Sequence, residues 1–182
     1  MSRKNPVFTP SELTASAVCI ALAVVISFVP VYQMPQGGSV GLCRMLFIAL
    51  PGYFFGPVIG VISAVSYGLI DFILKPYFYH PFQFLLDYIL GFGVLGLTGF
   101  FINRKYGLYN GFVLGVLGRF FFSTLSGVIF FYEYAGEQNV WIYSMGYQAT
   151  YIVAEAVLTV VLLAVPAVQD GIDRVKRMFR PA

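Results

Sequence analysis

Asp87 is the side chain whose type and position point most directly to chemistry. It lies, with Tyr88 directly after it, inside the apolar stretch 77–99, which is long enough to cross a bilayer. A charged side chain in that setting costs on the order of 3 kcal/mol unless it faces the interior of a helix bundle and has a partner. An acid at this place therefore predicts a functional site, and its negative charge favours a cationic ligand.

The other charged side chains in apolar stretches are placed by depth, counting about 1.5 Å per helical residue from the outer end of each predicted span. Arg44, Asp71 and Asp87 fall within roughly 10 Å of the outer surface on this count. Arg119 and Glu155 lie deeper, at about 20 Å, on neighbouring spans. Opposite charge at similar depth predicts a structural ion pair between Arg119 and Glu155, unless Glu155 faces water at the cytoplasmic mouth. The outer layer then has surplus negative charge.

Aromatic side chains gather in the same outer layer. Aromatic faces attract cations, so these rings around a carboxylate predict a pocket for a flat cationic ligand. The alternative is that some of them only form the aromatic belt at the membrane surface. The aromatic residues concerned are Tyr67, Tyr77, Tyr88, Phe131, Trp141, Tyr143 and Tyr147.

The elements that position these side chains are predicted to be transmembrane helices. The chain of 182 residues is 59% hydrophobic and only 10% charged, whereas about a quarter of the residues of a soluble domain are charged. At roughly 20 residues per span, we expect one all-α integral membrane domain, residues 1–182, with six transmembrane helices. The predicted spans are 11–29, 40–55, 58–74, 81–102, 111–134 and 140–165.

The positions of lysine and arginine predict the orientation in the cell membrane. Basic residues lie near the N-terminus, at 104–105 and in the tail 166–182, and the positive-inside rule puts all three groups in the cytoplasm. Both termini are then cytoplasmic, and the tail is predicted to rest on the lipid surface. The polar segment 31–39 faces outward and must lie at the membrane edge or line a cavity. Because the basic residues are scattered, no nucleic-acid partner is expected.

Several sequence motifs bear on catalysis, and none of them predicts an enzyme. Gly91, Gly93 and Gly96 have the spacing of a dinucleotide fingerprint, but they lie in the middle of an apolar span. Glycines at such a place predict close helix packing instead. The sequence contains no P-loop, zinc-binding His-Glu-x-x-His or serine nucleophile elbow. We therefore expect no catalytic activity, no cofactor and no metal site.

Small side chains form two rows on the first predicted span. One row consists of Ala17 and Ala21, and the other of Ala15, Cys19 and Ala23. Small residues four apart allow a second helix to approach closely in lipid. The rows predict either an internal helix contact or a docking surface for a partner protein.

The sequence resembles the membrane substrate-binding subunits, or S components, of energy-coupling-factor vitamin transporters, and specifically their thiamine-binding branch. The similarity covers nearly the whole chain. It is most specific at residues 80–88, His-Pro-Phe-Gln-Phe-Leu-Leu-Asp-Tyr, and is also clear at 34–40, 126–131, 134–135 and 143–144.

This resemblance implies a six-helix bundle that holds thiamine near the outer face, under a lid made by the first loop. Asp87 would be the acidic residue that contacts the ligand, with Tyr88 beside it and Tyr77 on the capping loop. Phe131 matches an aromatic stacking position and Tyr143 a ligand-contacting tyrosine.

The resemblance also implies partners. The small-residue face of the first span, with Ala15, Ala17 and Ala21, would dock onto a transmembrane coupling protein that works with two ATPases.

Three positions depart from the pattern of the family. Ser123 stands where a ligand-contacting histidine is common, Gln148 where asparagine is common, and Tyr67 where tryptophan often stands. A related ligand such as the pyrimidine precursor of thiamine, or another small vitamin, therefore stays open as an alternative. A self-sufficient proton-coupled carrier is a separate alternative. The candidate ligand-binding residues are Tyr67, Tyr77, Asp87, Tyr88, Ser123, Phe131, Tyr143, Tyr147 and Gln148.

Overall fold

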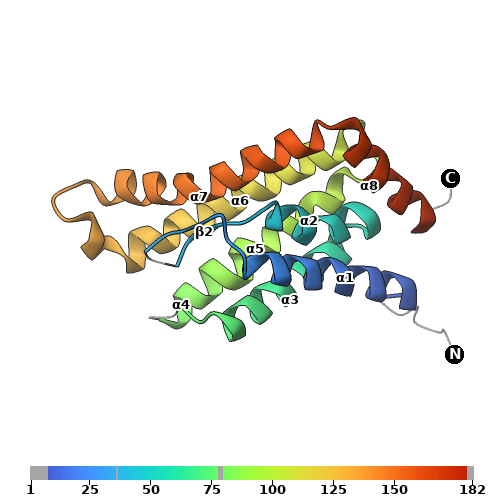
Figure 1. The fold of residues 1–182 in the computed structure, drawn as a ribbon. Coiled ribbons are helices and arrows are strands. Elements are labelled where there is room, and N and C mark those ends of the chain that lie inside the picture. Colours follow the sequence, from blue (N-terminus) through green and yellow to red (C-terminus); the bar gives the residue numbers. More distant parts are fainter. Residues whose placement is uncertain (1–7, 36, 78–79, 180–182) are drawn as a thin grey trace, which may run out of the picture.

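The computed structural model describes residues 8–35, 37–77 and 80–179, and these form a bundle of helices with one small hairpin (Figure 1). The elements in chain order are α1 (Pro10–Ser27), β1 (Tyr32–Gln33), β2 (Ser39–Val40), α2 (Arg44–Phe55), α3 (Pro57–Leu74), α4 (Pro81–Phe84), η1 (Leu85–Leu90), α5 (Gly91–Gly93), η2 (Val94–Phe101), α6 (Gly107–Phe130), η3 (Tyr132–Ala135), α7 (Val140–Leu163) and α8 (Pro166–Phe179).

Five helical stretches of the described chain are long and apolar enough to cross a membrane, and α2 is a shorter apolar helix. The predicted all-α membrane architecture is thereby confirmed. α1 starts at a capping box, in which Thr9 Oγ1 accepts from the Glu12 amide and Glu12 Oε2 accepts from the Thr9 amide. α1 begins and α8 ends at the same end of the bundle, while α6 and α7 run side by side along its length (Figure 1).

α2 differs most from its predicted span. It begins at Arg44 rather than at residue 40 and has 12 residues, a length of about 18 Å, which is too short for a bilayer. The residues before it form an antiparallel hairpin in which Tyr32 pairs with Val40 and Gln33 with Ser39. Gly37 turns this hairpin with a φ of +85°, a conformation that glycine adopts without strain.

The fourth predicted span is one helical rod with changing geometry. It runs from α4 through the π-helix η1 and the short α5 into the 3₁₀-helix η2. η2 packs against α2 and α3 through glycines: a Cβ on Gly96 would lie 2.3 Å from the carbonyl carbon of Gly60, and one on Gly52 would lie 2.5 Å from the Gly96 carbonyl oxygen. The close packing predicted for this glycine-rich span is therefore correct at Gly96.

The two small-residue rows of α1 have different surroundings. Cys19 and Ala23 are buried, and Ala15 packs against the same core. This row thus includes an internal helix contact, one of the two arrangements predicted for the small-residue rows, and Ala15 in it is half-buried. Ala17 and Ala21 face outward and are exposed.

The basic tail forms α8, which packs against the end of α2 (Figure 1). Phe179 meets the Phe55 ring edge-on at 5.2 Å. Lys176 Nζ lies 3.9 Å from the centre of the Tyr53 ring and donates to the Ile102 carbonyl at 2.6 Å. One side of this amphipathic helix therefore contacts protein.

Candidate ligand-binding site

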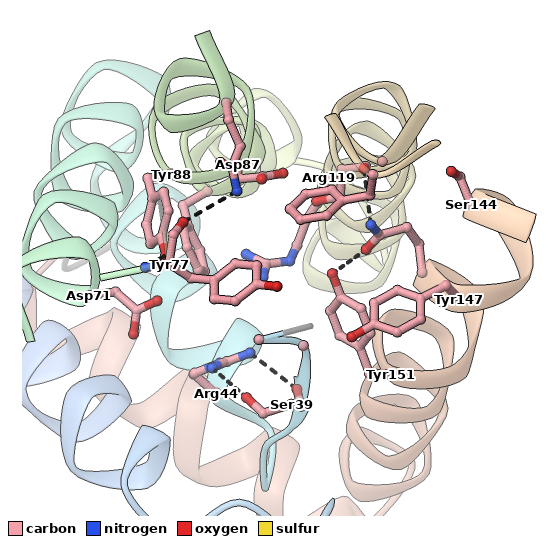
Figure 2. A pocket seen from close by; sticks show the side chains of 18 of the residues that line it. Ser39, Arg44, Asp71, Tyr77, Asp87, Tyr88, Arg119, Ser144, Tyr147 and Tyr151 are labelled. Carbon is pink, nitrogen blue, oxygen red and sulfur yellow. Dashed lines mark hydrogen bonds between the residues drawn. The ribbon is translucent and has the colours of Figure 1, made fainter. Parts of the chain in front are cut away.

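A pocket of about 760 Å³, counted to its open mouth, lies between the hairpin, η1, α6 and α7 (Figure 2). The lining residues are Gly37, Gly38, Ser39, Arg44, Asp71, Tyr77, Gln83, Asp87, Tyr88, Phe92, Arg119, Ser123, Gly127, Phe131, Tyr143, Ser144, Tyr147, Gln148 and Tyr151. Residues 37–39 of the polar hairpin thus line a cavity, one of the two places that its composition allowed.

Asp87 faces this pocket from the π-helix η1. π-turns within longer helices are rare and concentrate at functional sites, because they change the direction in which side chains point. Here Asp87 and the following Tyr88 both line the pocket. The Asp87 carboxylate is half-buried and accepts a hydrogen bond from Ser126 Oγ at 2.8 Å. The protein holds this carboxylate in place and leaves it directed at the cavity.

Tyr77, Tyr88 and Phe131 form one aromatic wall of the pocket. The Tyr88 hydroxyl donates to the Lys75 carbonyl at 3.4 Å and accepts from the Tyr77 amide at 3.2 Å. Tyr77 and Phe131 stack with ring centres 5.8 Å apart and planes inclined by 15°. The structure therefore brings these three predicted residues together beside Asp87.

The opposite wall comes from α6 and α7. The Gln148 side-chain amide donates to the Ser123 carbonyl at 3.0 Å, and the Tyr151 hydroxyl donates to Gln148 Oε1. Tyr143 and Tyr147 stack one turn apart with ring centres at 6.4 Å. Two of the three predicted departures from the family pattern, Ser123 and Gln148, thus lie in the pocket wall and contact each other.

The predicted ion pair between Arg119 and Glu155 is wrong. Glu155 pairs instead with Arg44, at 3.5 Å, and also accepts from the amides of Met45 at 2.7 Å and Gly41 at 3.1 Å. Counting residues along the chain misplaced Arg44, because it assumed a helix from residue 40. The hairpin instead enters the bundle, and α2 starts at Arg44 beside Glu155.

Arg119 lines the pocket as well, which corrects the expectation of surplus negative charge in its lining. Its guanidinium carbon lies 3.9 Å from the centre of the Phe92 ring. The lining thus contains two arginines and two aspartates. With Glu155, which lies behind Arg44, the group of five charged side chains has a formal net charge of −1.

Two expected site residues lie elsewhere. Tyr67 is fully buried outside the lining, where its hydroxyl donates to Asp71 at 3.2 Å. Trp141 is 52% exposed and is also absent from the lining. Both residues were predicted from their depth along a span. Depth alone does not say whether a side chain points toward the pocket.

Sequence reasoning missed part of the α7 wall. Ser144, Gln148, Tyr151 and Glu155 are all buried, and they are spaced 4, 3 and 4 residues apart in an otherwise apolar helix. That spacing puts them on one helix face. A polar stripe of this kind was a usable signal for Ser144 and Tyr151. Gln83, four residues before Asp87, could have been found by the same rule.

Fold and pocket together define a multi-pass membrane protein with an internal site for a small molecule. The family model described as Thiamine transporter protein (Thia_YuaJ) matches residues 13–172. The chain therefore belongs to this thiamine transporter family.

A curated relative agrees with that assignment, and a solved structure shares the fold. The chain is 31% identical, over 169 residues, to the thiamine transporter ThiT of Bacillus subtilis (strain 168). The match covers 84% of this chain and 88% of that protein. It also matches the fold of a solved structure of ThiT from Listeria monocytogenes, with a TM-score of 0.66 and 22% identity over 86% of this chain and 95% of that one. The family and the Bacillus subtilis relative are both named for thiamine transport, a transport function rather than a catalytic one.

Proposed function

We propose that this protein binds thiamine at the pocket and takes it up as the substrate-binding subunit of an energy-coupling-factor transporter. Asp87 is the observation that carries the proposal, because its carboxylate faces an aromatic-walled pocket inside the membrane. Thiamine joins a permanently cationic thiazolium ring to a neutral aminopyrimidine ring. A ligand of charge +1 with two flat rings complements a charged group of net −1 and walls of tyrosine and phenylalanine.

The hairpin is the element that would close over the ligand. Gly38 lies against the Tyr151 ring so closely that a Cβ at that position would be 2.7 Å from Tyr151 Cε1. Residues 37–39 line the pocket, so displacement of this segment would open it. Capture from the outside followed by hairpin closure is the mechanism that we propose.

Energy for uptake would come from separate subunits. The sequence contains no P-loop, the element with which many ATPases bind their nucleotide. Ala17 and Ala21 offer an exposed small-residue face on α1, a kind of surface that allows close helix contact in lipid. We propose that a transmembrane coupling protein docks there and connects the chain to two ATPases.

Substitution of Asp87 tests the binding proposal. Asp87→Asn keeps the shape of the side chain and removes its charge, so thiamine affinity should fall at least tenfold in isothermal titration calorimetry in detergent. Calorimetry is preferable to tryptophan fluorescence, since Trp141 lies outside the pocket. Asp173→Asn is the matched control and should leave affinity unchanged, because Asp173 lies on α8, outside the pocket lining, and accepts a hydrogen bond from Tyr53 of α2. Equal affinities of wild type and Asp87→Asn would remove Asp87 from the site.

Two further measurements separate the alternatives. Titration with the free hydroxymethyl-aminopyrimidine should give much weaker binding than thiamine, since this compound lacks the cation; tighter binding would make the pyrimidine the ligand. Uptake into liposomes should require the coupling protein and both ATPases. ATPase-independent uptake driven by a proton gradient would instead identify a self-sufficient carrier.

A further inference from the structure

Arg119 is a buried cation with unused hydrogen-bond donors. Its side chain is 6% exposed, and neither Nε nor Nη1 has a hydrogen-bond partner within the described part of the chain. Among the same residues, the ion pair within 4.0 Å joins Arg44 to Glu155 and leaves Arg119 without a carboxylate in contact. Figure 2 shows the guanidinium projecting into the pocket, between the sides occupied by Asp87 and Arg44. Buried donors without acceptors are costly, so a group from outside the chain is the expected partner.

Arg44 shows what a satisfied arginine looks like in the same pocket. Its Nη1 donates to Ser39 Oγ at 3.3 Å, and its Nη2 donates to the Ser39 carbonyl at 3.4 Å and pairs with Glu155. Arg44 therefore holds the hairpin and the start of α2 in place. Arg119 makes one described contact of a different kind, with the face of the Phe92 ring, and that contact uses none of its in-plane donors.

Charge decides which part of a ligand can approach Arg119. The proposed ligand has one cationic ring, and Arg119 repels it while Asp87 attracts it. The cationic ring therefore lies on the Asp87 side, and the neutral ring is left for the Arg119 side. The five charged side chains in and behind the lining, Arg44, Asp71, Asp87, Arg119 and Glu155, have a formal net charge of −1. A ligand of charge +1 neutralises it, so charge balance does not require an anion at Arg119.

We infer that Arg119 is a specificity-determining residue that donates a hydrogen bond to an uncharged acceptor of the ligand, a ring nitrogen of its pyrimidine. This inference rests on the proposed thiamine-binding function. Arg119 supplies hydrogen-bond donors and has no acceptor, so it can hydrogen-bond a ring that carries nitrogen lone pairs but not a hydrocarbon ring of the same shape. Sites built to hydrogen-bond a ligand discriminate strongly against analogues that lack the matching group.

A chemical double-mutant cycle tests this assignment. The ligands are thiamine and 3-benzyl-5-(2-hydroxyethyl)-4-methylthiazolium, which keeps the cationic ring but has phenyl in place of the pyrimidine. The protein variants are wild type and Arg119→Met, whose side chain is also long and unbranched. Calorimetry should show that Arg119→Met loses at least tenfold in affinity for thiamine and less than threefold for the benzyl analogue. A partly misfolded variant would lose affinity for both ligands by the same factor, so the ratio isolates the contact.

Arg44→Met is the matched control, because Arg44 is an arginine of the same pocket that the protein itself satisfies. It should weaken both ligands equally. Arg119→Lys keeps the charge but not the planar donor fork, and it should also reduce the preference for thiamine. Equal losses for both ligands in Arg119→Met would overturn the inference. A loss seen only with thiamine monophosphate would overturn it too, by placing an anion at Arg119. In either case, tight binding of thiamine by the wild type would leave the proposed function standing, whereas absent binding would refute that function first.

Discussion

Glu155 should be the most sensitive position for stability outside the ligand-contacting residues. It lies on α7 with 1% of its surface exposed, yet it contacts three groups on the segment that connects the hairpin to α2. Its two oxygens accept from the amides of Met45 and Gly41, and the carboxylate pairs with Arg44. The amide of Met45 belongs to the first turn of α2, whose free N–H groups favour a negative partner. Glu155 therefore fixes the start of α2 and the pocket residues next to it.

Glu155→Gln preserves volume and removes the charge. Loss of one member of a buried ion pair costs about 3–5 kcal/mol, because the other charge is left unpaired. The NH₂ group of the new glutamine would face one of the three donors that Glu155 accepts from, the Met45 amide, the Gly41 amide or the Arg44 guanidinium. At least one hydrogen bond to a charged group is therefore lost, which accounts for about 1.5–3 kcal/mol of that total. For a chain of this size each kcal/mol lowers the melting temperature by roughly 2–4 °C. We expect a decrease of about 6–20 °C.

Thermal unfolding in detergent, with thiamine binding measured in parallel, checks this expectation. Arg44→Met alone should also destabilise, but the double variant should be at least ~1.5 kcal/mol more stable than the sum of the single effects predicts, because neither charge is then left alone. Glu133→Gln, at an exposed carboxylate, is the control and should be neutral. An unchanged melting temperature for Glu155→Gln, or strictly additive single effects, would refute the reasoning.

Two further predictions follow from helix packing. Gly96→Ala should lower the melting temperature, since its Cβ would lie 2.3 Å from the backbone of Gly60. Gly146→Ala should leave the melting temperature unchanged or raise it slightly, because a Cβ there would meet no atom of a neighbouring element within 4 Å. Thermal unfolding of this matched pair is the test, and equal shifts would contradict the packing explanation. Ala17→Leu combined with Ala21→Leu should abolish ATP-driven uptake in reconstituted liposomes and leave thiamine affinity unchanged; full uptake would move the coupling surface elsewhere.

The sequence predicted the helices where the apolar pattern was long and clearly punctuated. α7 begins at residue 140 as expected, and Pro57 and Pro81 each open a helix at the predicted break. It did not predict the late start of α2. That boundary depends on contacts from Gly41 and Met45 to Glu155, more than 100 positions away along the chain. A local pattern contains no information about such contacts.

The residue types that form the candidate site were predictable from the sequence, but the contacts between its charged side chains were less so. Asp87, Tyr88 and Phe131 were found because an acid and aromatic rings are costly or distinctive at those places in lipid. The partners of Arg119 and Glu155 were not, since depth counted along an ideal helix fails where a hairpin or a π-turn intervenes. Residue type thus identified the pocket, and irregular backbone decided which charges meet inside it.

The central claim is that Asp87 is the counterion of a cationic ring. The most direct test compares thiamine with its thiophene isostere, in which carbon replaces the positively charged ring nitrogen, in wild type and in Asp87→Asn. If Asp87 is this counterion, the wild type should prefer thiamine at least tenfold, and Asp87→Asn should lose most of this preference while it still binds the isostere. Equal affinity of the wild type for both compounds, or a preference that survives in Asp87→Asn, would contradict it.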